Sequence, residues 1–600
     1  MGARAAQAKV GSRFVLRMGE GEGLSRNSGS CGETRASGLW GTRRGGRGTD
    51  GRQHASGKRG LLALAVLALA APLAATASGG NGSPQSYLAP SLERAATQTP
   101  DSSVRVIVQG PSGSDARHAL DRFGSVGERL GVVDAAAGTV RAGELPQLAA
   151  QPGLVITPDN PVVLDAGHKT DTGLSSGELW PHAVGVDQFW GQAPKWKKPG
   201  NGNGGGGGQP IGAAPTIAFV DSGIDAGRTD FGDRILASVD LTSLPDNSPG
   251  DGYGHGTLVA GLAAGSASRY AGAAPTAGIV SLDVMDDHGM ARTSDVIAAA
   301  QWILDNRDEY DIRVANFSLH SATASSFRWD PLDKAVEKLW FSGVTVVASA
   351  GNEGQSQNKP VRMGFAPAND PFVVTVGALD LHNSTNTEQT SVAPWSAWGY
   401  TYDGFVKPEL SAPGRAITGP IPSGSTLAND RKGQIVETPD GTYIKLSGTS
   451  LSAPIVSGIA ADLLALHSSL TPDQLKGALM LGALPLRKVQ TAAAGVGEVY
   501  LPAAPLIALP PNPNRALDRF LVSDPAGPGV VFDDVAWHDA ARSSSAWNSV
   551  SWSDGWNGAL WSVSSWASVS WSDVSWSDVS WSDVSWSDVS WEDTADADAG

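Results

Sequence analysis

Three short segments, far apart in this 600-residue chain, carry an acid, a base and an alcohol in a fixed order. A strand-like run ends in Asp221, the motif Gly-His-Gly-Thr holds His255, and the motif Gly-Thr-Ser holds Ser450 before an apolar, helix-like stretch. A serine hydroxyl is a poor nucleophile until a base takes its proton, and a histidine does this well when a carboxylate holds its ring. A fold that uses these residues must bring all three segments to one place.

The order Asp, His, Ser is the subtilisin order. On these three motifs, residues 175–500 resemble the subtilisin-like serine peptidases, or subtilases. The resemblance implies that Ser450 is the nucleophile, that His255 is its general base, and that Asp221 orients His255. It also marks Asn352 as the oxyanion donor, which acts together with the backbone N–H of Ser450.

Two neighbouring residues compete for these roles, and two positions depart from the family pattern. Asp225 is the alternative to Asp221, and Ser452 is the alternative nucleophile. Leu258 stands where the family often has a second histidine. The substrate-pairing strand of the family usually ends in Ser-Leu-Gly-Gly, whereas residues 318–321 read Ser-Leu-His-Ser. The residue preference on the acyl side of the cut is therefore not predicted, although an extended peptide should still bind by strand addition.

Strand-like and helix-like runs alternate between residues 216 and 466. The run Val344–Ala348 is almost continuously apolar, as a central parallel strand buried on both faces should be. Such alternation predicts an α/β fold, with a parallel sheet covered by helices on both faces. Sites gather at the carboxyl ends of the strands in such sheets, and Asp221 and Asn352 both follow strand-like runs.

A small α+β unit is predicted before the catalytic domain, over residues 102–165, after a linker at 78–101. Its order is βαββαβ, with a hairpin framed by Gly131–Val133 and Thr139-Val140. This order resembles the inhibitory propeptide of subtilases, which implies folding assistance and occupation of the active-site cleft until cleavage. We expect the cut between Pro161 and Leu174; an unrelated ferredoxin-like module is the alternative.

Charge and composition describe the two ends of the chain. The net charge is −16, but residues 1–57 form a basic leader that is either disordered or upstream of the true start. The acidic remainder argues against nucleic acid as a partner. Residues 58–77 combine Lys-Arg, an apolar run and Ala-Thr-Ala. They predict a secretory signal peptide and no stable membrane span, with a membrane anchor as the alternative.

The C-terminal part changes composition. Residues 501–545 are predicted to be a Pro-rich linker, and residues 546–591 contain a Ser-Asp-Val-Ser-Trp repeat of period five. The repeat is either a sticky disordered segment or a square β-coil of the pentapeptide-repeat kind, and its tryptophans suggest contact with carbohydrate, cell wall or another copy. An acidic tail, 592–600, follows, and a glycine-rich insertion at 200–208 is expected to be a flexible surface loop.

The sequence thus predicts a secreted serine endopeptidase that acts on proteins or peptides and is controlled by its own propeptide. Its chemistry requires no cofactor. A structural calcium ion is compatible with the resemblance, but the acidic residues between 240 and 251 show no calcium-loop spacing. The alternative is a non-catalytic surface protein of the same fold that binds through its Trp-repeat tail.

Overall fold

The computed structural model describes residues 86–164, 179–190 and 213–543, except 268, 488 and 490. The chain divides into two units, Met1–Ser78 and Gly79–Gly600, and every described residue belongs to the second. Several predictions lie outside the described residues: the leader, the signal peptide, the glycine-rich insertion, the Trp repeats and the acidic tail.

The centre of the described part is an eight-stranded sheet of the predicted kind. Its order is β16-β15-β13-β11-β7-β9-β8, and β19 also pairs with β15. All pairs are parallel except β15 with β16. Each residue of β7, β9, β13 and β15 is buried, as expected for strands covered on both faces. The strands are β7 (Thr216–Asp221), β8 (Ile235–Asp240), β9 (Ile279–Asp283), β11 (Ile312–Phe317), β13 (Thr345–Ser349), β15 (Val374–Asp380), β16 (Ser391–Val392) and β19 (Leu410–Pro413).

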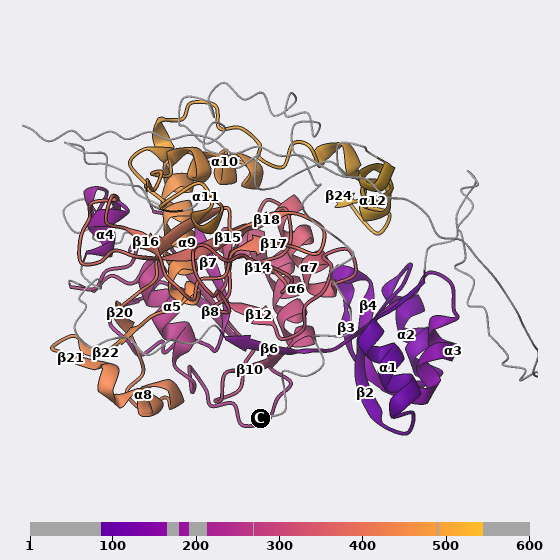
Figure 1. Ribbon diagram of the computed structural model, residues 1–600. Helices are drawn as coiled ribbons and strands as arrows, with labels where there is room; N and C mark the ends of the chain where they lie inside the picture. The colour runs from indigo at the N-terminus through magenta and orange to yellow at the C-terminus, as the bar shows by residue number, and fades with distance from the viewer. Residues whose placement is uncertain are drawn as a thin grey trace, which may run out of the picture. The chain divides into compact units, whose positions relative to one another are not determined.

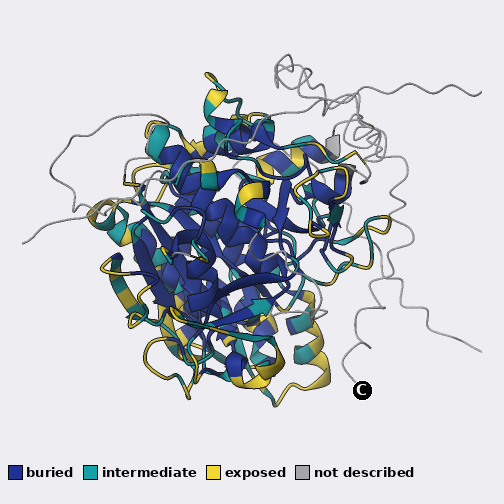
Figure 2. Ribbon diagram, turned by 90° about the vertical axis from the view of Figure 1, so that its left-hand side faces the viewer, coloured by how far each residue is buried: buried dark blue, intermediate teal, exposed yellow. Residues whose placement is uncertain are grey.

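Two helix pairs cover this sheet, as Figure 1 shows. Helices α5 (His255–Ala264) and α9 (Thr449–Leu466) pack on each other and on the strands, and α6 (Thr293–Tyr310) and α7 (Pro331–Phe341) form the second pair. Figure 2 shows that the buried residues gather in the centre of the fold, whereas exposed residues lie at its surface. Among the described helices, α9 alone is long and apolar enough to cross a membrane, but 89% of it is buried inside the fold. It therefore has the properties of a core helix.

A five-stranded sheet precedes this core, in the order β1-β5-β2-β4-β3. It has its own apolar core, which includes Val106, Leu120 and Leu148. Its elements are β1 (Tyr87–Leu88), α1 (Pro90–Gln98), β2 (Ser103–Gln109), α2 (Gly113–Asp121), β3 (Gly124–Leu130), β4 (Ala135–Arg141), α3 (Leu145–Ala149) and β5 (Val155–Pro158).

Two expectations for this unit are wrong. The described part of the expected linker, from residue 86, belongs to the sheet unit, because β1 pairs with β5 and Leu92 of α1 lies in the core. Residues Gly131–Val133 form a 3-10 turn between β3 and β4 rather than the first strand of the hairpin. Burial of Val132 and Val133 in the main core explains why this turn is apolar enough to be taken for a strand.

One strand joins the small unit to the main domain. Strand β6 (Pro161–Leu164) lies between β10 (Met290–Arg292) and β12 (Leu319–Ser321) and is antiparallel to both. A further backbone bond runs from the N–H of Ala322 to the carbonyl of Pro161. Residues 161–164 therefore use both backbone edges to bind the main domain.

The expected Pro-rich linker at 501–545 is wrong for residues 501–543, which are folded. Phe532 and Trp537 pack against Phe327 of the main domain, with ring centroids 6.0 and 5.4 Å from that ring. The prolines suggested a linker, but the aromatic residues stabilise a folded segment, because their burial removes a large apolar area from water. The elements here are η6 (Ala504–Leu506), η7 (Asp518–Phe520), β23 (Leu521–Ser523), β24 (Val530–Phe532) and α12 (Asp534–Ser543).

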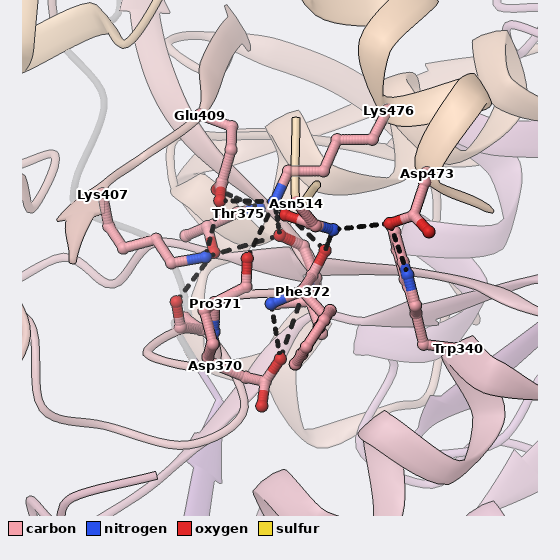
Figure 3. A network of polar contacts seen from close by, with 12 residues as sticks. Trp340, Asp370, Pro371, Phe372, Thr375, Lys407, Glu409, Asp473, Lys476 and Asn514 are labelled. Carbon is pink, nitrogen blue, oxygen red and sulfur yellow. Dashed lines mark hydrogen bonds and ion pairs between the residues drawn. The ribbon is translucent and has the colours of Figure 1, made fainter. Parts of the chain in front are cut away.

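A buried polar network holds the same segment, as Figure 3 shows. The ammonium group of Lys476, on α10 (Pro472–Gly482), donates to Glu409 at 2.9 Å and to Asn514 at 3.3 Å. Lys407 donates to the same Glu409 oxygen at 2.7 Å. Burial alone would raise the pKa of Glu409, but the two lysines hold it below its usual value. Burial also lowers the pKa of Lys407 to about 8.

The remaining elements are short and lie around the main sheet. They form two three-stranded sheets, β14-β17-β18 and β20-β22-β21, and three short helices. Their bounds are α4 (Trp180–Ala183), β14 (Val361–Arg362), β17 (Gly399–Tyr400), β18 (Val406–Lys407), β20 (Ile417–Pro420), α8 (Thr426–Asp430), β21 (Ile435–Thr438), β22 (Gly441–Leu446) and α11 (Thr491–Ala494).

Candidate active site

Asp221 and His255 meet at the carboxyl end of β7. The Nδ1 atom of His255 lies 2.7 Å from Oδ1 of Asp221, and both side chains are 1% exposed. The backbone N–H of Ser222 donates to the same carboxylate oxygen at 2.8 Å. Because Asp221 accepts at this oxygen, it fixes the proton of His255 on Nδ1 and leaves Nε2 as the basic atom.

Glycines allow the two loops to approach this closely. Gly254, the residue before His255, has a φ of 103°, which other residues rarely adopt. A Cβ on Gly256 would lie 2.0 Å from the carbonyl oxygen of Gly223. The start of α5 is therefore pressed directly against the turn that carries Asp221, and no larger residue fits there.

Ser450 lies in the first turn of α9, at the end of the neighbouring strand. The hydroxyl of Ser318, just after β11, donates to the carbonyl of Ser450 at 2.9 Å, and β11 pairs with β7. Helices α5 and α9 thus begin at the same edge of the sheet. They meet again farther along, where a Cβ on Gly458 would lie 2.6 Å from the carbonyl oxygen of Ala263.

This contact sets the two helices in register. Ala263 is eight residues after His255, and Gly458 is eight residues after Ser450. Each contact point is therefore about 12 Å along its helix from the candidate base or nucleophile. The close contact thus lies at the same distance along both helices from the candidate base and the candidate nucleophile, which favours a position of the two residues near each other.

Asn352 follows β13 and is held by the residue before Ser450. Its Oδ1 atom accepts from the backbone N–H of Thr449 at 3.0 Å and from the Thr449 hydroxyl at 3.2 Å. The N–H of Gly351 donates to the same hydroxyl at 3.2 Å. Since the amide oxygen is occupied by Thr449, the amide N–H₂ group points away from it and is oriented as a donor.

The two rival residues have other partners. The carboxylate of Asp225 accepts from the N–H of Gly227 at 3.0 Å, as in an Asx turn. The hydroxyl of Ser452 donates to the carbonyls of Ala412 and Pro413, at 3.1 and 3.3 Å. Neither geometry resembles a catalytic contact with His255.

Sequence reasoning missed one acidic residue that supports the site. Asp251 accepts from the Ser222 hydroxyl at 2.9 Å, the Gly254 N–H at 2.6 Å and the Thr257 N–H at 2.8 Å. The Ser222 hydroxyl in turn accepts from the N–H of Gly256 at 3.0 Å. Burial raises the pKa of Asp251 to about 7, although these donors favour its charged form. The available signal was an acid four residues before His255 in a glycine-rich turn.

The described residues contain no group of three or more His, Cys, Asp or Glu placed to hold a metal ion. The Asp and Asn residues at 240–251 have other contacts: Asp251 accepts from the N–H of Thr257 in α5 at 2.8 Å, and Asn247 donates to Asp283 at 3.0 Å. The structural calcium ion that the resemblance allows stays an expectation, since amide and backbone carbonyl oxygens can also bind calcium.

Comparisons with known proteins agree with this geometry. A model of the subtilase family matches residues 212–500. Serine protease AprX of Bacillus subtilis (strain 168) is 33% identical over 280 residues, which are 45% of this chain and 61% of that protein. Subtilisin of Bacillus pumilus is 32% identical over 270 residues, 45% of this chain and 83% of that protein.

The match is local for the longer relatives. Subtilisin E of Bacillus subtilis (strain 168) is 32% identical over 270 residues, and this chain spans only 60% of it. Fervidolysin of Fervidobacterium pennivorans, a keratinolytic enzyme related to subtilisin, superposes with a TM-score of 0.52 at 23% identity, over 69% of this chain and 62% of its own, which shows a shared fold. With most of the Bacillus pumilus subtilisin covered at 32% identity, the chain belongs to the subtilase family.

Proposed function

We propose that this chain is a secreted serine endopeptidase that uses Ser450, His255 and Asp221, with Asn352 as oxyanion donor. The observation that carries the proposal is the buried 2.7 Å contact between His255 and Asp221, at the head of the helix that packs beside the helix of Ser450. Named relatives of the chain are serine proteases. A binding protein would have no need of this buried contact, so the non-catalytic alternative is not favoured.

The proposed reaction follows from these positions. Ser450 Oγ attacks the peptide carbonyl carbon while His255 Nε2 takes the hydroxyl proton. Asp221 stabilises the imidazolium that forms, and the Asn352 amide with the Ser450 N–H stabilises the negative oxygen. His255 then returns the proton to the leaving amine, and a water molecule repeats the sequence to release the acyl group.

Peptide substrates are proposed to bind as an added strand between β10 and β12. Residues 161–164 already lie there, with His320 opposite Val163 and Ala291 opposite Val162. Main-chain bonds on both edges make such binding tolerant of sequence. The substrate and the chain's own segment therefore compete for one place.

This competition supports the proposal that the unit up to residue 165 is an inhibitory propeptide. In this proposal the small unit folds first, and its strand β6 blocks the cleft. The enzyme would then stay inactive until the chain is cut between Pro161 and Leu174. N-terminal sequencing of secreted protein tests this: a start within that interval is expected. Secreted material that still begins near Ser78 contradicts maturation at this place.

The catalytic proposal is tested with a fluorophosphonate probe, which labels activated serines covalently. Mass spectrometry should find the adduct on Ser450. Ser450→Ala should remove it, and His255→Ala should slow labelling by several orders of magnitude because the base is lost. A folded wild-type protein without the adduct would contradict the proposal and favour the binding protein.

We further propose that the Trp-repeat tail, 546–591, contacts carbohydrate, cell wall or a second copy of the chain. Regularly spaced tryptophans are a common means of such contact. Sedimentation and cell-wall pulldown of full-length and tail-deleted protein test this. Equal sedimentation and equal cell-wall binding of the two forms would contradict this proposal.

A further inference from the structure

The register of β6 defines which substrate residue stands next to the nucleophile. Leu164 is opposite Leu319, and Val163 is opposite His320. A peptide bound in this register and extended by one position beyond that of Leu164 would set its next residue opposite Ser318. The Ser318 hydroxyl donates to the carbonyl of Ser450 at 2.9 Å, so this next residue would lie beside Ser450, and the proposed function makes it the residue on the acyl side of the cut.

The side chain of that residue shares a face with His320. Side chains two positions apart on a strand point to the same face, so positions 318 and 320 share one. Directly opposite residues of an antiparallel pair also share a face, and diagonal neighbours lie within reach of a large side chain. His320 is therefore the diagonal neighbour of the residue on the acyl side of the cut.

His320 does not stand alone at this position. Its Nε2 atom lies 3.4 Å from a carboxylate oxygen of Glu353, the residue after Asn352. Its Nδ1 atom lies 2.8 Å from the carbonyl oxygen of Ser321. The ring of Phe365 is 5.3 Å from the imidazole ring, measured between centroids. The subsite next to the oxyanion donor is thus bounded by an aromatic ring, an imidazole and a carboxylate.

Both ring nitrogens of His320 lie beside oxygen atoms, one of Glu353 and one of the Ser321 backbone, so polar contacts on both sides hold the ring in one orientation. The imidazole side chain is 8% exposed, whereas that of Glu353 is 47% exposed. A large apolar side chain would have to cover the imidazole and the Glu353 carboxyl group and remove them from water, which is unfavourable unless these polar groups gain new partners. A small or polar side chain leaves the pair solvated.

We infer that His320 and Glu353 determine the specificity of this peptidase by restricting the acyl-side residue to small or polar side chains. The inference rests on the proposed function, since it assigns a preference to the same site. A glycine at position 320 would leave an open slot for a large side chain. The imidazole fills that slot, and Glu353 holds the imidazole in place.

The test uses the purified full chain after maturation and a set of peptides that differ only at the acyl-side residue: Ala, Ser, Leu, Phe or Lys. Wild type is expected to have a higher kcat/KM for Ala and Ser than for Leu and Phe. His320→Gly should raise the ratio of Phe to Ala by about tenfold or more, because a change of pocket volume by even one methylene alters discrimination by about 10–200-fold.

Two further variants separate volume from charge and from general damage. Glu353→Gln keeps the side-chain size and leaves the imidazole in the slot, so it should raise the ratio of Phe to Ala much less than His320→Gly does; an equal rise in both variants would contradict the role of His320 volume. His467→Ala replaces an exposed histidine at the end of α9 and should leave every ratio unchanged.

Fluorophosphonate labelling of Ser450 keeps the two proposals distinguishable. A His320→Gly variant that is labelled as fast as wild type, but whose ratio of Phe to Ala is unchanged, overturns the specificity inference alone. So does a wild-type enzyme that cleaves after Phe as well as after Ala. A wild-type chain that is not labelled overturns the proposed function, and this inference with it.

Discussion

Replacing Gly458 with alanine tests whether the contact between α5 and α9 positions the candidate base and nucleophile. The added Cβ would lie 2.6 Å from the carbonyl oxygen of Ala263 and 2.6 Å from Cβ of Ala273. Ordinary contacts of this kind begin at 3.4 Å, so the helices must separate by about 0.8 Å. No flexible side chain is present to absorb the change, because both neighbours are backbone or Cβ atoms.

The separation should reach the candidate active site, since His255 begins α5 and Ser450 lies in the first turn of α9. A misplacement of about 1 Å costs roughly a hundredfold in rate when a reaction depends on near-attack geometry. We therefore expect kcat to fall by about 10–100-fold in Gly458→Ala, with KM changed little because β10 and β12 are not involved. Overpacking should also lower the free energy of unfolding by about 1–3 kcal/mol.

The assay combines hydrolysis of a chromogenic peptide with the rate of fluorophosphonate labelling, so that substrate binding and serine activation are measured separately. Gly433→Ala is the matched control, because Gly433 is exposed and a Cβ there meets nothing within 4 Å. If Gly458→Ala retains the wild-type kcat while it is destabilised, the helix contact does not position the site and the reasoning is refuted.

Three further predictions concern other parts of the chain. Asn352→Ala should lower kcat by about 10²–10³-fold with little change in KM, because an oxyanion donor acts mainly in the transition state; equal losses in binding would count against the role. Burial raises the pKa of Asp251 to about 7, so its contribution to stability is fully present below about pH 4 and is lost as the pH rises through 7. In an inactive Ser450→Ala background, Asp251→Asn should therefore reduce the fall in unfolding free energy between pH 5 and 8, as measured in urea; an unchanged slope would exclude Asp251 as its source. Deletion of residues from 501 onward should lower Tm by several degrees or prevent folding, because it removes the buried contacts of Phe532 and Asn514. Deletion from 544 onward should keep Tm within about 2 °C. Calorimetry that finds the same Tm for both deletions would argue against docking of this segment.

Much of the main domain could be predicted because its strands are locally distinctive. Val344–Ala348 reads as a buried parallel strand from its apolar run alone, and the structure contains β13 there. The subtilisin-like α/β fold is confirmed. The roles of Asp221, His255, Ser450 and Asn352 remain predictions, although the structure does bring Asp221 to His255 and holds Asn352 through Thr449.

The misplaced linkers show what sequence patterns leave out. Residues 86–101 and 501–543 have prolines and short apolar runs, and their order depends on distant partners such as β5 and Phe327. Asp251 could not be recognised for a similar reason. Its structural role depends on three hydrogen-bond donors that only the tertiary fold brings to one carboxylate. An isolated acid in a glycine-rich turn carries no sign of that arrangement.

The bond between Asn352 and Thr449 has a mechanical consequence. Thr449 is the residue before Ser450, and both its backbone N–H and its hydroxyl donate to the amide oxygen of Asn352. In the proposed reaction, the attacking group of Ser450 and the oxyanion donor of Asn352 are therefore linked through one residue. When the start of α9 moves, Asn352 moves with it through Thr449. The distance between the Ser450 side chain and the Asn352 amide should therefore change less than it would without this bond.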